Sequence, residues 1–307
     1  MPNSLFLYHF SYQDIEEALA KIVFTQLFGK QAFSSFVVSS KDYDLENWSF
    51  LHFKIEVFCF NKDYTTFKKE LNQLDFHDWH LDTWHYNKNL DYHQRIDITK
   101  DIADSLSNIG KITDYSLELL WALLDGIWYL GIVCYNRYFY KLRIHKPYQY
   151  SSALPVRLCH QLINLLHLML PHASFIDPAA GSGTLVIEAL LAGLNIRAYE
   201  INKILCQQAN ANLQHFGLPA IIENCDMLQT TDTFTVCILD LPYGLFTAVA
   251  KTQQISLLQH SLNIADYLLL ISTDDYGNYL ENWACQVIWQ CQANKAKFTR
   301  LLSWIKK

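Results

Sequence analysis

The spacing of hydrophobic and polar residues changes character near residue 150. Before that point, segments in which apolar and polar side chains alternate are mixed with segments of helical period. Residues 51–60 show the strand pattern, with Phe53, Ile55 and Val57 on one face. The first part of the chain is therefore predicted to be a mixed α+β domain. Its expected elements are Leu5–Phe10, Asp14–Phe28, Phe33–Ser39, Leu51–Phe60, Asp63–Leu74, Trp79–Tyr86 and Ile98–Ile109, followed by a hairpin that turns at Asp125–Gly126.

From residue 151 onward, strands and helices alternate, which is typical of a parallel sheet wound with helices. We therefore predict a doubly wound, Rossmann-like α/β domain over 147–307, preceded by the smaller domain over 1–146. Ligands of such a sheet bind at the carboxyl ends of its strands. The expected elements are a helix from Ser151 or Ser152 to Leu170, then Ser174–Asp177, Ser182–Ala192, Ile196–Glu200, Asn202–Phe216, Ala220–Asn224, Thr235–Asp240 and Tyr267–Ser272, and a closing hairpin of Trp283–Cys291 and Lys297–Ile305.

The composition excludes several classes of protein. The 307 residues are 51% hydrophobic and 18% charged, which is enough for a sizeable core. No apolar run approaches the roughly 18 residues of a membrane span, and the first residues lack the pattern of a signal peptide. The eight cysteines occur singly, without a CxxC pair, so we expect a cytoplasmic protein with reduced thiols.

A group of histidines follows Asp75 and could suggest a metal site. No cysteine accompanies them, and they alternate with aromatic residues as in a strand, so we expect no metal there. The histidines are His77, His80, His85 and His93.

The charge is distributed unevenly along the chain. A net charge of −6 argues against a nucleic-acid binder that works by overall charge. However, no acidic residue occurs between Asp125 and Asp177, and aromatic residues are interleaved with basic ones in that stretch. An ordinary strand with a solvated charged face would also show this pattern, but we favour contact with RNA phosphates and bases. The basic residues expected to make this contact are Arg137, Lys141, Arg143 and Lys146.

A glycine-containing turn between a strand and a helix is the first candidate for chemistry. The segment Asp177-Pro-Ala-Ala-Gly-Ser-Gly-Thr184 allows close approach of a ligand to the backbone and offers free N–H groups at the helix start. Glu200, at the end of the next strand, is placed to accept both hydroxyls of a ribose. Asp226, after the third strand, is placed to meet an adenine amino group. Together these features predict a nucleoside pocket.

A second motif follows the strand that ends at Asp240. In Asp240-Leu-Pro-Tyr-Gly244, the carboxylate and the Leu241 carbonyl can accept the two N–H hydrogens of a planar amine. Pro242 stiffens the turn, and Tyr243 can stack on the ring that carries the amine.

The two motifs resemble those of S-adenosylmethionine-dependent methyltransferases that act on exocyclic amines. The junction Lys146–Arg157 and the preceding Trp128–Gly131 make the chain most similar to the THUMP-containing tRNA guanine-N2 methyltransferases of the guanosine-10 type. The resemblance implies a class I methyltransferase domain after a THUMP/ferredoxin-like domain that docks RNA, with S-adenosylmethionine as cofactor and tRNA as partner. Leu241 stands where many relatives have proline, and with Gly244 it favours guanine N2 over DNA adenine.

The resemblance also assigns residues to the two ligands. Catalysis would rest on positioning and on acceptors for the charge that develops on nitrogen, so Asp240 need not be a strong base. The residues implied for the target base are Asp240, Leu241, Pro242 and Tyr243. Those implied for the cofactor are Asp177, Pro178, Gly181, Ser182, Gly183, Thr184, Glu200, Ile201, Asp226 and Met227.

Other interpretations stay open at this point. The same motifs serve ribosomal-RNA guanine-N2 and DNA adenine-N6 methyltransferases, and a catalytically silent RNA-binding subunit could retain the fold. The net charge of −6 leaves room for a small basic partner subunit. The sequence leaves open the target nucleotide, the number of methyl groups added and the oligomeric state.

Overall fold

The computed structural model describes residues 4–29, 33–74, 79–83, 90–106, 117–151, 153–242, 250–295 and 298–307. The chain divides into two compact units. The first unit comprises Met1–Ser11, Ala32–Leu45 and Phe50–Arg137, and the second comprises Tyr12–Gln31, Glu46–Ser49 and Tyr138–Lys307.

This division differs from a single boundary at residue 146, because part of the N-terminal sequence belongs to the second unit. Helix α1 (Glu17–Phe28), which follows the 3-10 turn η1 (Asp14–Glu16), packs against helix α4 (Val156–Met169) and strand β12 (Gln286–Lys295). It buries an apolar face that includes Leu19, Val23 and Leu27. Burial of such a face stabilises a helix more than its intrinsic propensity does, which explains its place in the second unit.

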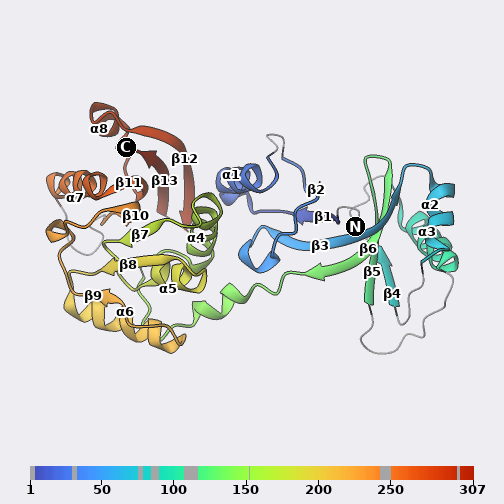
Figure 1. The fold of residues 1–307 in the computed structure, drawn as a ribbon, viewed down its shortest axis with the longest axis horizontal. Coiled ribbons are helices and arrows are strands. Elements are labelled where there is room, and N and C mark those ends of the chain that lie inside the picture. Colours follow the sequence, from blue (N-terminus) through green and yellow to red (C-terminus); the bar gives the residue numbers. More distant parts are fainter. Residues whose placement is uncertain are drawn as a thin grey trace. The chain divides into compact units, whose positions relative to one another are not determined.

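The first unit is built on a six-stranded mixed sheet in the order β2-β1-β3-β6-β5-β4. All neighbouring pairs are antiparallel except β4 and β5, which are parallel. Helices α2 and α3 pack against each other, α2 also against β3 and α3 also against β4 (Figure 1). The bounds of these elements are β1 Leu5–Phe10, β2 Phe36–Ser39, β3 Leu51–Asn61, α2 Tyr64–Leu71, β4 Trp79–Thr83, α3 Tyr92–Ser105, β5 Leu117–Leu124 and β6 Ile127–Tyr135.

Local sequence accounts for the ends of these elements. Asp63 caps α2 by accepting a hydrogen bond from the Thr66 backbone, and Asp91 forms a capping box with Gln94 at the start of α3. Asp125 and Gly126 both have positive φ, as the two-residue turn between β5 and β6 requires. The expected hairpin at Asp125–Gly126 is therefore present.

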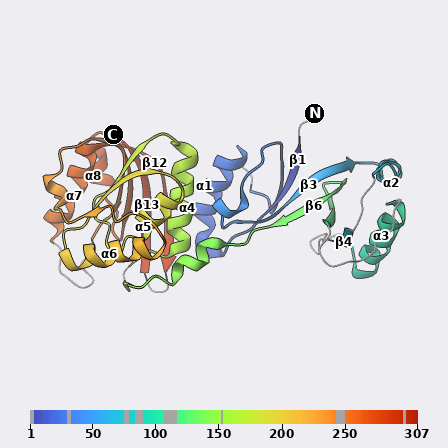
Figure 2. The same cartoon turned by 60° about the horizontal axis from the view of Figure 1, so that its bottom comes forward.

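The second unit is a doubly wound α/β domain, which confirms the predicted fold class. Its seven strands lie in the order β12-β13-β11-β10-β7-β8-β9. The strands from β11 to β9 pair in parallel, and β13 runs antiparallel to both β11 and β12. In Figure 2, helices α7 and α8 lie on one side of the strands and α4 lies on the other. The bounds of the other elements of the second unit are η3 Phe139–Ile144, β7 Ser174–Asp177, α5 Thr184–Leu191, β8 Asn195–Tyr199, α6 Lys203–His215, β9 Ile222–Glu223, η4 Met227–Gln229, β10 Phe234–Asp240, α7 Lys251–Ile264, β11 Ala265–Ser272, α8 Gly277–Asn282 and β13 Phe298–Lys306.

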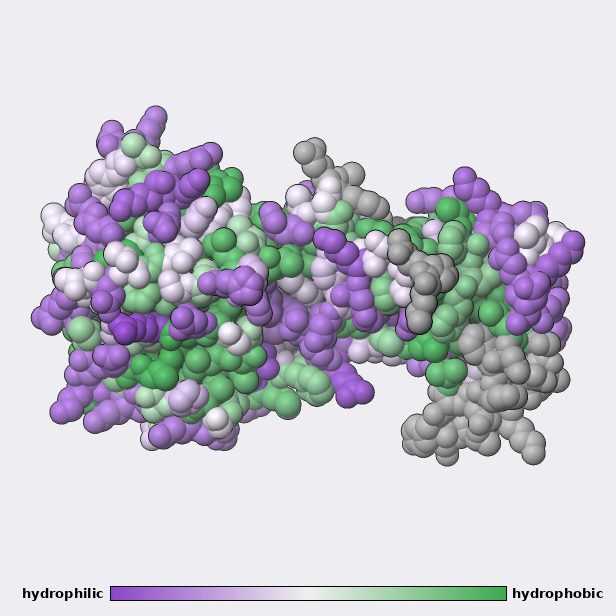
Figure 3. All heavy atoms as spheres, in the orientation of Figure 1, coloured by the Kyte–Doolittle hydropathy of each residue, from purple (hydrophilic) through white to green (hydrophobic). Residues whose placement is uncertain are grey.

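Two details of the second unit differ from the expectation. Helix α4 begins at Val156 with Pro155 at its cap and without a side-chain cap, so Ser151 does not start it. Helix α7 is not among the predicted elements, although it buries Leu257, Leu258 and Leu262 against the sheet. On the face drawn in Figure 3, hydrophobic residues of this unit lie in several places among hydrophilic ones. Among the residues described here, none of the helices has the length and apolar character needed to cross a membrane.

Candidate active site

A cavity of about 360 Å³ lies at the carboxyl ends of β7, β8 and β10. The strand order reverses between β7 and β10, which is where open α/β sheets bind their ligands. Most residues implied for cofactor and target base line this one cavity. They are Asp177, Pro178, Gly181, Ser182, Thr184, Glu200, Ile201, Asp226, Met227, Asp240, Leu241 and Pro242.

The glycine turn joins β7 to α5 and needs glycine at two positions. Gly181 and Gly183 have φ of 55° and 77°, in the left-handed region that other residues rarely adopt. A Cβ on Gly183 would also lie 3.2 Å from the Ile222 side chain. Gly183 is the cap of α5 and does not itself line the cavity, so its contribution is to shape the turn.

Glu200 links the glycine turn to the end of β8. Its carboxylate accepts hydrogen bonds from the backbone N–H of Gly181 at 2.9 Å and of Asn202 at 2.8 Å. Burial raises the pKa of Glu200, and these two hydrogen bonds oppose that effect. Asp226 is half-buried and accepts a hydrogen bond from Leu228 N at 3.0 Å, which caps the turn η4.

Asp177 is the most deeply buried acid of the cavity. Its side chain accepts a hydrogen bond from Ala179 N at 3.2 Å. Burial, together with the nearby carboxylates of Asp240 and Glu200, raises the pKa of Asp177 to about 8. A bound cation would favour the ionised form of this carboxyl, so the site is suited to a positively charged group.

The turn after β10 is held by hydrogen bonds that the sequence does not indicate. Leu241 N donates to Ile271 O at 2.9 Å, and Gln254 Nε2 donates to Pro242 O at 2.8 Å. The Tyr276 hydroxyl donates to Gln254 Oε1 at 2.8 Å. Gln254 lies on α7, and the helical spacing of its buried leucines is the signal that could have revealed this helix. Tyr243 lies outside the described residues.

The four basic residues expected to contact RNA separate into two groups. Arg143 donates to both oxygens of buried Glu188, from Nε at 2.6 Å and Nη2 at 2.8 Å. Lys146 donates from Nζ to Ser182 Oγ at 3.0 Å and to Thr184 Oγ1. Both side chains are therefore directed into the second unit, which corrects the expectation of phosphate contact for them. The other two residues, Arg137 and Lys141, are exposed.

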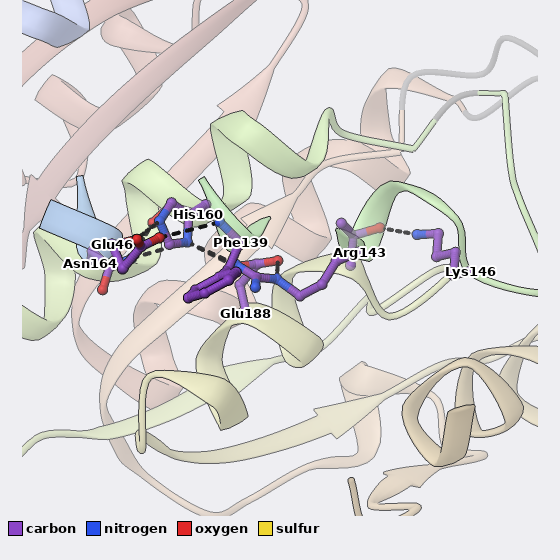
Figure 4. A network of polar contacts seen from close by, with 8 residues as sticks. Glu46, Phe139, Arg143, Lys146, His160, Asn164 and Glu188 are labelled. Carbon is purple, nitrogen blue, oxygen red and sulfur yellow. Dashed lines mark hydrogen bonds and ion pairs between the residues drawn. The ribbon is translucent and has the colours of Figure 1, made fainter. Parts of the chain in front are cut away.

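Arg143 belongs to a buried polar network on α4 and α5 (Figure 4). His160 Nε2 lies 2.8 Å from the Glu46 carbonyl oxygen and donates to it, and His160 Nδ1 lies 3.0 Å from Glu188 Oε2 and 3.2 Å from Arg143 Nη2. Asn164 Nδ2 donates to His160 O at 2.8 Å. The network fixes the segment that enters the second unit at η3.

Two of the four histidines that follow Asp75, His77 and His85, lie outside the described residues. Among the residues that the structure does describe, no three histidine, cysteine or acidic side chains are grouped as a metal site would require.

Comparison with known proteins finds similarity to methyltransferases in the second unit. Residues 143–269 match a family model described as "RMKL-like, methyltransferase domain". A tRNA (guanine(10)-N2)-dimethyltransferase of Pyrococcus abyssi is 27% identical over 110 residues, which are 34% of this chain and 32% of the relative. The enzyme of the same name from Methanothermobacter thermautotrophicus is 26% identical over 134 residues, 42% of this chain and 40% of the relative. The matches thus span about a third to two fifths of these curated relatives. Over that region they confirm the resemblance that the motifs indicate.

At least one solved structure matches this chain over nearly its whole length. TrmN from Thermus thermophilus superposes with a TM-score of 0.50 at 12% identity, covering 99% of each chain. At this identity the similarity concerns the fold alone.

Proposed function

We propose that the protein is an S-adenosylmethionine-dependent methyltransferase that modifies the exocyclic N2 of guanosine in tRNA, at position 10. The observation that carries the proposal is the joining of both motifs at one cavity. The glycine turn, Glu200 and Asp226 line it, and so do Asp240, Leu241 and Pro242. A methyl donor bound by the first set and an acceptor amine bound by the second would share one cavity.

The residues present fit the cofactor. The cavity lies within the usual range of ligand pockets, roughly 300–1,000 Å³. Glu200 offers carboxylate oxygens for the ribose hydroxyls, Asp226 an acceptor for the adenine amino group, and Asp177 a carboxylate for the ammonium of the amino-acid part. When bound, the cofactor supplies an activated methyl group on a sulfonium centre.

The chain's own contribution to the reaction is to position the amine. Asp240 and the Leu241 carbonyl accept its two N–H hydrogens and so direct the nitrogen lone pair along the line of transfer. The cofactor, held by Asp177, Glu200 and Asp226, would supply the methyl group to the nitrogen that Asp240 and Leu241 position. The Asp240 carboxylate stabilises the positive charge that develops on nitrogen, which then loses one proton.

The choice of tRNA as substrate rests on the names of two relatives and on the two exposed basic residues, Arg137 and Lys141. Two relatives are named tRNA (guanine(10)-N2)-dimethyltransferases. The first unit acts in this proposal as a THUMP-like RNA-docking module, with exposed Arg137 and Lys141 contacting phosphates. The target guanine leaves its stack to enter the cavity, at a cost of a few kcal/mol.

The decisive experiment offers methyl-labelled cofactor with separate pools of unmodified tRNA, ribosomal RNA and duplex DNA, followed by nucleoside analysis. The proposal expects N2-methylguanosine in tRNA, and loss of label when guanosine 10 is replaced by adenosine. Label in ribosomal RNA, or N6-methyladenine in DNA, would overturn the choice of substrate. An absence of both label and cofactor binding would favour the silent RNA-binding subunit.

The role of Asp240 is tested by a matched pair of variants. Asp240→Asn should lower kcat at least roughly 100-fold and leave the cofactor Kd within a few-fold, because the proposal assigns this residue to the amine and not to the cofactor. Asp266→Asn changes an exposed aspartate at the start of β11 and should leave both constants unchanged. Equal turnover by Asp240→Asn and the wild type would contradict the assignment.

A further inference from the structure

A second cavity, of about 300 Å³, lies in the second unit at the carboxyl end of β11. It is bordered by the segment that follows β11 and by side chains of β12 and β13. None of the described residues that line it also lines the first cavity. The lining residues are Thr273, Asp275, Gln290, Gln292, Thr299 and Leu301. The volume is at the lower end of the usual range for ligand pockets, roughly 300–1,000 Å³, so this is a candidate binding site separate from the first.

Strand pairing places the second cavity on the side of β10 opposite to the residues assigned to the cofactor. In the sheet, β10 separates β7 and β8, which lead into the glycine turn and Glu200, from β11, β13 and β12. Asp240 of β10 pairs with Ile271 of β11, and Ile271 pairs with Leu302 of β13. Neighbouring strands lie about 4.8 Å apart, so β13 lies roughly 10 Å from β10. Enzymes that unstack a base also contact the nucleotides beside it, and this distance suits such a neighbour.

Hydrogen bonds connect the wall of the second cavity to the turn assigned to the target base. Asp275 Oδ1 accepts a hydrogen bond from Gly277 N at 2.9 Å, which fixes the carboxylate and leaves Oδ2 for a ligand. Tyr276, the next residue, donates to Gln254, which in turn donates to the Pro242 carbonyl. The two sites are therefore held at a fixed separation within one unit.

The side chains of the second cavity are mostly polar. Among the described residues that line it, Asp275 is acidic and none is basic. A carboxylate repels a phosphate group, whereas amides, hydroxyls and carboxylates form hydrogen bonds with the edges of unstacked bases. Gln290 Nε2 donates to Ser303 Oγ at 3.0 Å, which fixes that amide. The side chains of Gln292 and Thr299 are exposed and form no hydrogen bond with another part of the described chain, so they can contact a ligand.

We propose that the second cavity binds the base of a nucleotide next to the target guanosine and favours a base with an exocyclic amino group. The inference rests on the proposed function, because this nucleotide belongs to the RNA whose guanine enters the first cavity. The amino groups of cytosine, adenine and guanine can donate to Asp275 Oδ2, whereas uracil presents O4, an acceptor that the carboxylate repels. The amides of Gln290 and Gln292 offer donors and acceptors for the rest of the base edge.

The test measures kcat/KM for methyl transfer to tRNAs that carry cytidine or uridine at each position flanking the target guanosine, with the pairing partner changed to match. The wild type should prefer cytidine by about tenfold at one of these positions. Asp275→Asn should bring this preference close to one, because the new amide N–H can donate to uracil O4, and should leave the cofactor Kd unchanged. Asp266→Asn, an exposed residue at the opposite end of β11, is the matched control and should keep the wild-type preference.

The outcomes separate the inference from the proposed function. If the wild type methylates guanosine in none of these tRNAs, the proposed function fails. If it methylates cytidine and uridine tRNAs equally at both positions, only the inference fails. The inference also fails if Asp275→Asn keeps the wild-type preference, or lowers kcat/KM for both tRNAs equally, as a purely structural residue would. Should Asp275→Asn not fold, Gln292→Leu should lower the ratio of kcat/KM between the cytidine tRNA and one that is abasic at the same position, and an unchanged ratio would overturn the inference.

Discussion

A chain of hydrogen bonds runs from Tyr276 through Gln254 to Pro242. Neither Tyr276 nor Gln254 lines the cavity expected to bind the cofactor and the target base, yet we predict that both affect catalysis. Tyr276 and Gln254 are 2% and 7% exposed, and Gln254 Nε2 holds the Pro242 carbonyl at 2.8 Å. They fix the turn that carries Asp240. Their replacement should therefore lower kcat and leave the cofactor Kd unchanged.

The size of the effect follows from what each variant leaves unpaired. Tyr276→Phe removes the hydroxyl that donates to Gln254 Oε1, which should lower the free energy of unfolding by about 1–3 kcal/mol. Gln254→Leu also removes the donor to Pro242 O, so the turn can shift. A misplacement of about 1 Å costs roughly 100-fold in rate, or about 2.7 kcal/mol. We expect a loss of kcat of about threefold to tenfold for Tyr276→Phe and of about 10-fold to 100-fold for Gln254→Leu.

The assay is methyl transfer to tRNA at saturating cofactor, with calorimetric measurement of cofactor Kd on the same preparations. Tyr279→Phe is the matched control, because it removes a hydroxyl from the neighbouring α8 and the residue is 37% exposed. It should keep both kcat and stability. An unchanged kcat for Gln254→Leu would refute the reasoning, and so would a loss confined to the cofactor Kd.

Three further predictions concern buried and exposed charges. Arg143→Met should lower the free energy of unfolding by about 3–5 kcal/mol, because it leaves Glu188 buried without its cation, whereas Arg197→Met breaks an exposed pair and should cost less than about 1 kcal/mol; urea unfolding measures both. Burial raises the pKa of Asp177 to about 8, so the folded protein without cofactor keeps a proton that the unfolded chain releases near pH 4. The folding stability that this proton contributes is lost as the pH rises from about 4 through 8. Asp177→Asn should therefore remove a decline of up to about 1.4 kcal/mol per pH unit between about pH 6 and 8, and parallel wild-type and variant profiles would contradict this. Charge reversal at Arg137 and Lys141 should weaken tRNA binding and flatten its salt dependence, as read from titrations at several salt concentrations, and an unchanged slope would exclude them as the docking residues.

Local patterns of apolar and polar residues were sufficient to predict most helices and strands of the second unit. The strand Ser174–Asp177 was predicted with its observed bounds, because a short apolar run ends at the glycine turn. The helix expected from Asn202 begins one residue later, where the Asn202 side chain accepts hydrogen bonds from Ile204 N and Leu205 N. The place of α1 was not predictable in the same way, because its amphipathic face does not specify which distant surface will cover it.

The direction of long side chains also could not be predicted from the sequence. A stretch of basic residues without acids is typical of a solvated or RNA-binding surface when only neighbours along the chain are considered. Glu188 lies 45 residues beyond Arg143, and the two meet because α5 packs beside α4, which also contacts η3. Lys146 meets Thr184 across 38 residues for a similar reason.

Most basic side chains between Asp125 and Asp177 thus form ion pairs or hydrogen bonds inside the second unit. Arg157 pairs with Glu16 of η1 at 2.9 Å, Arg143 with Glu188, and Lys146 contacts the glycine turn. These contacts tie η1, α4, α5 and the turn of the cavity to the segment that leads in from the first unit. A polar network of this kind is costly when only partly satisfied, so a change in one member should be felt by the others. The start of the second unit is therefore held in place by its own basic residues, and one of them, Lys146, contacts residues that line the cavity.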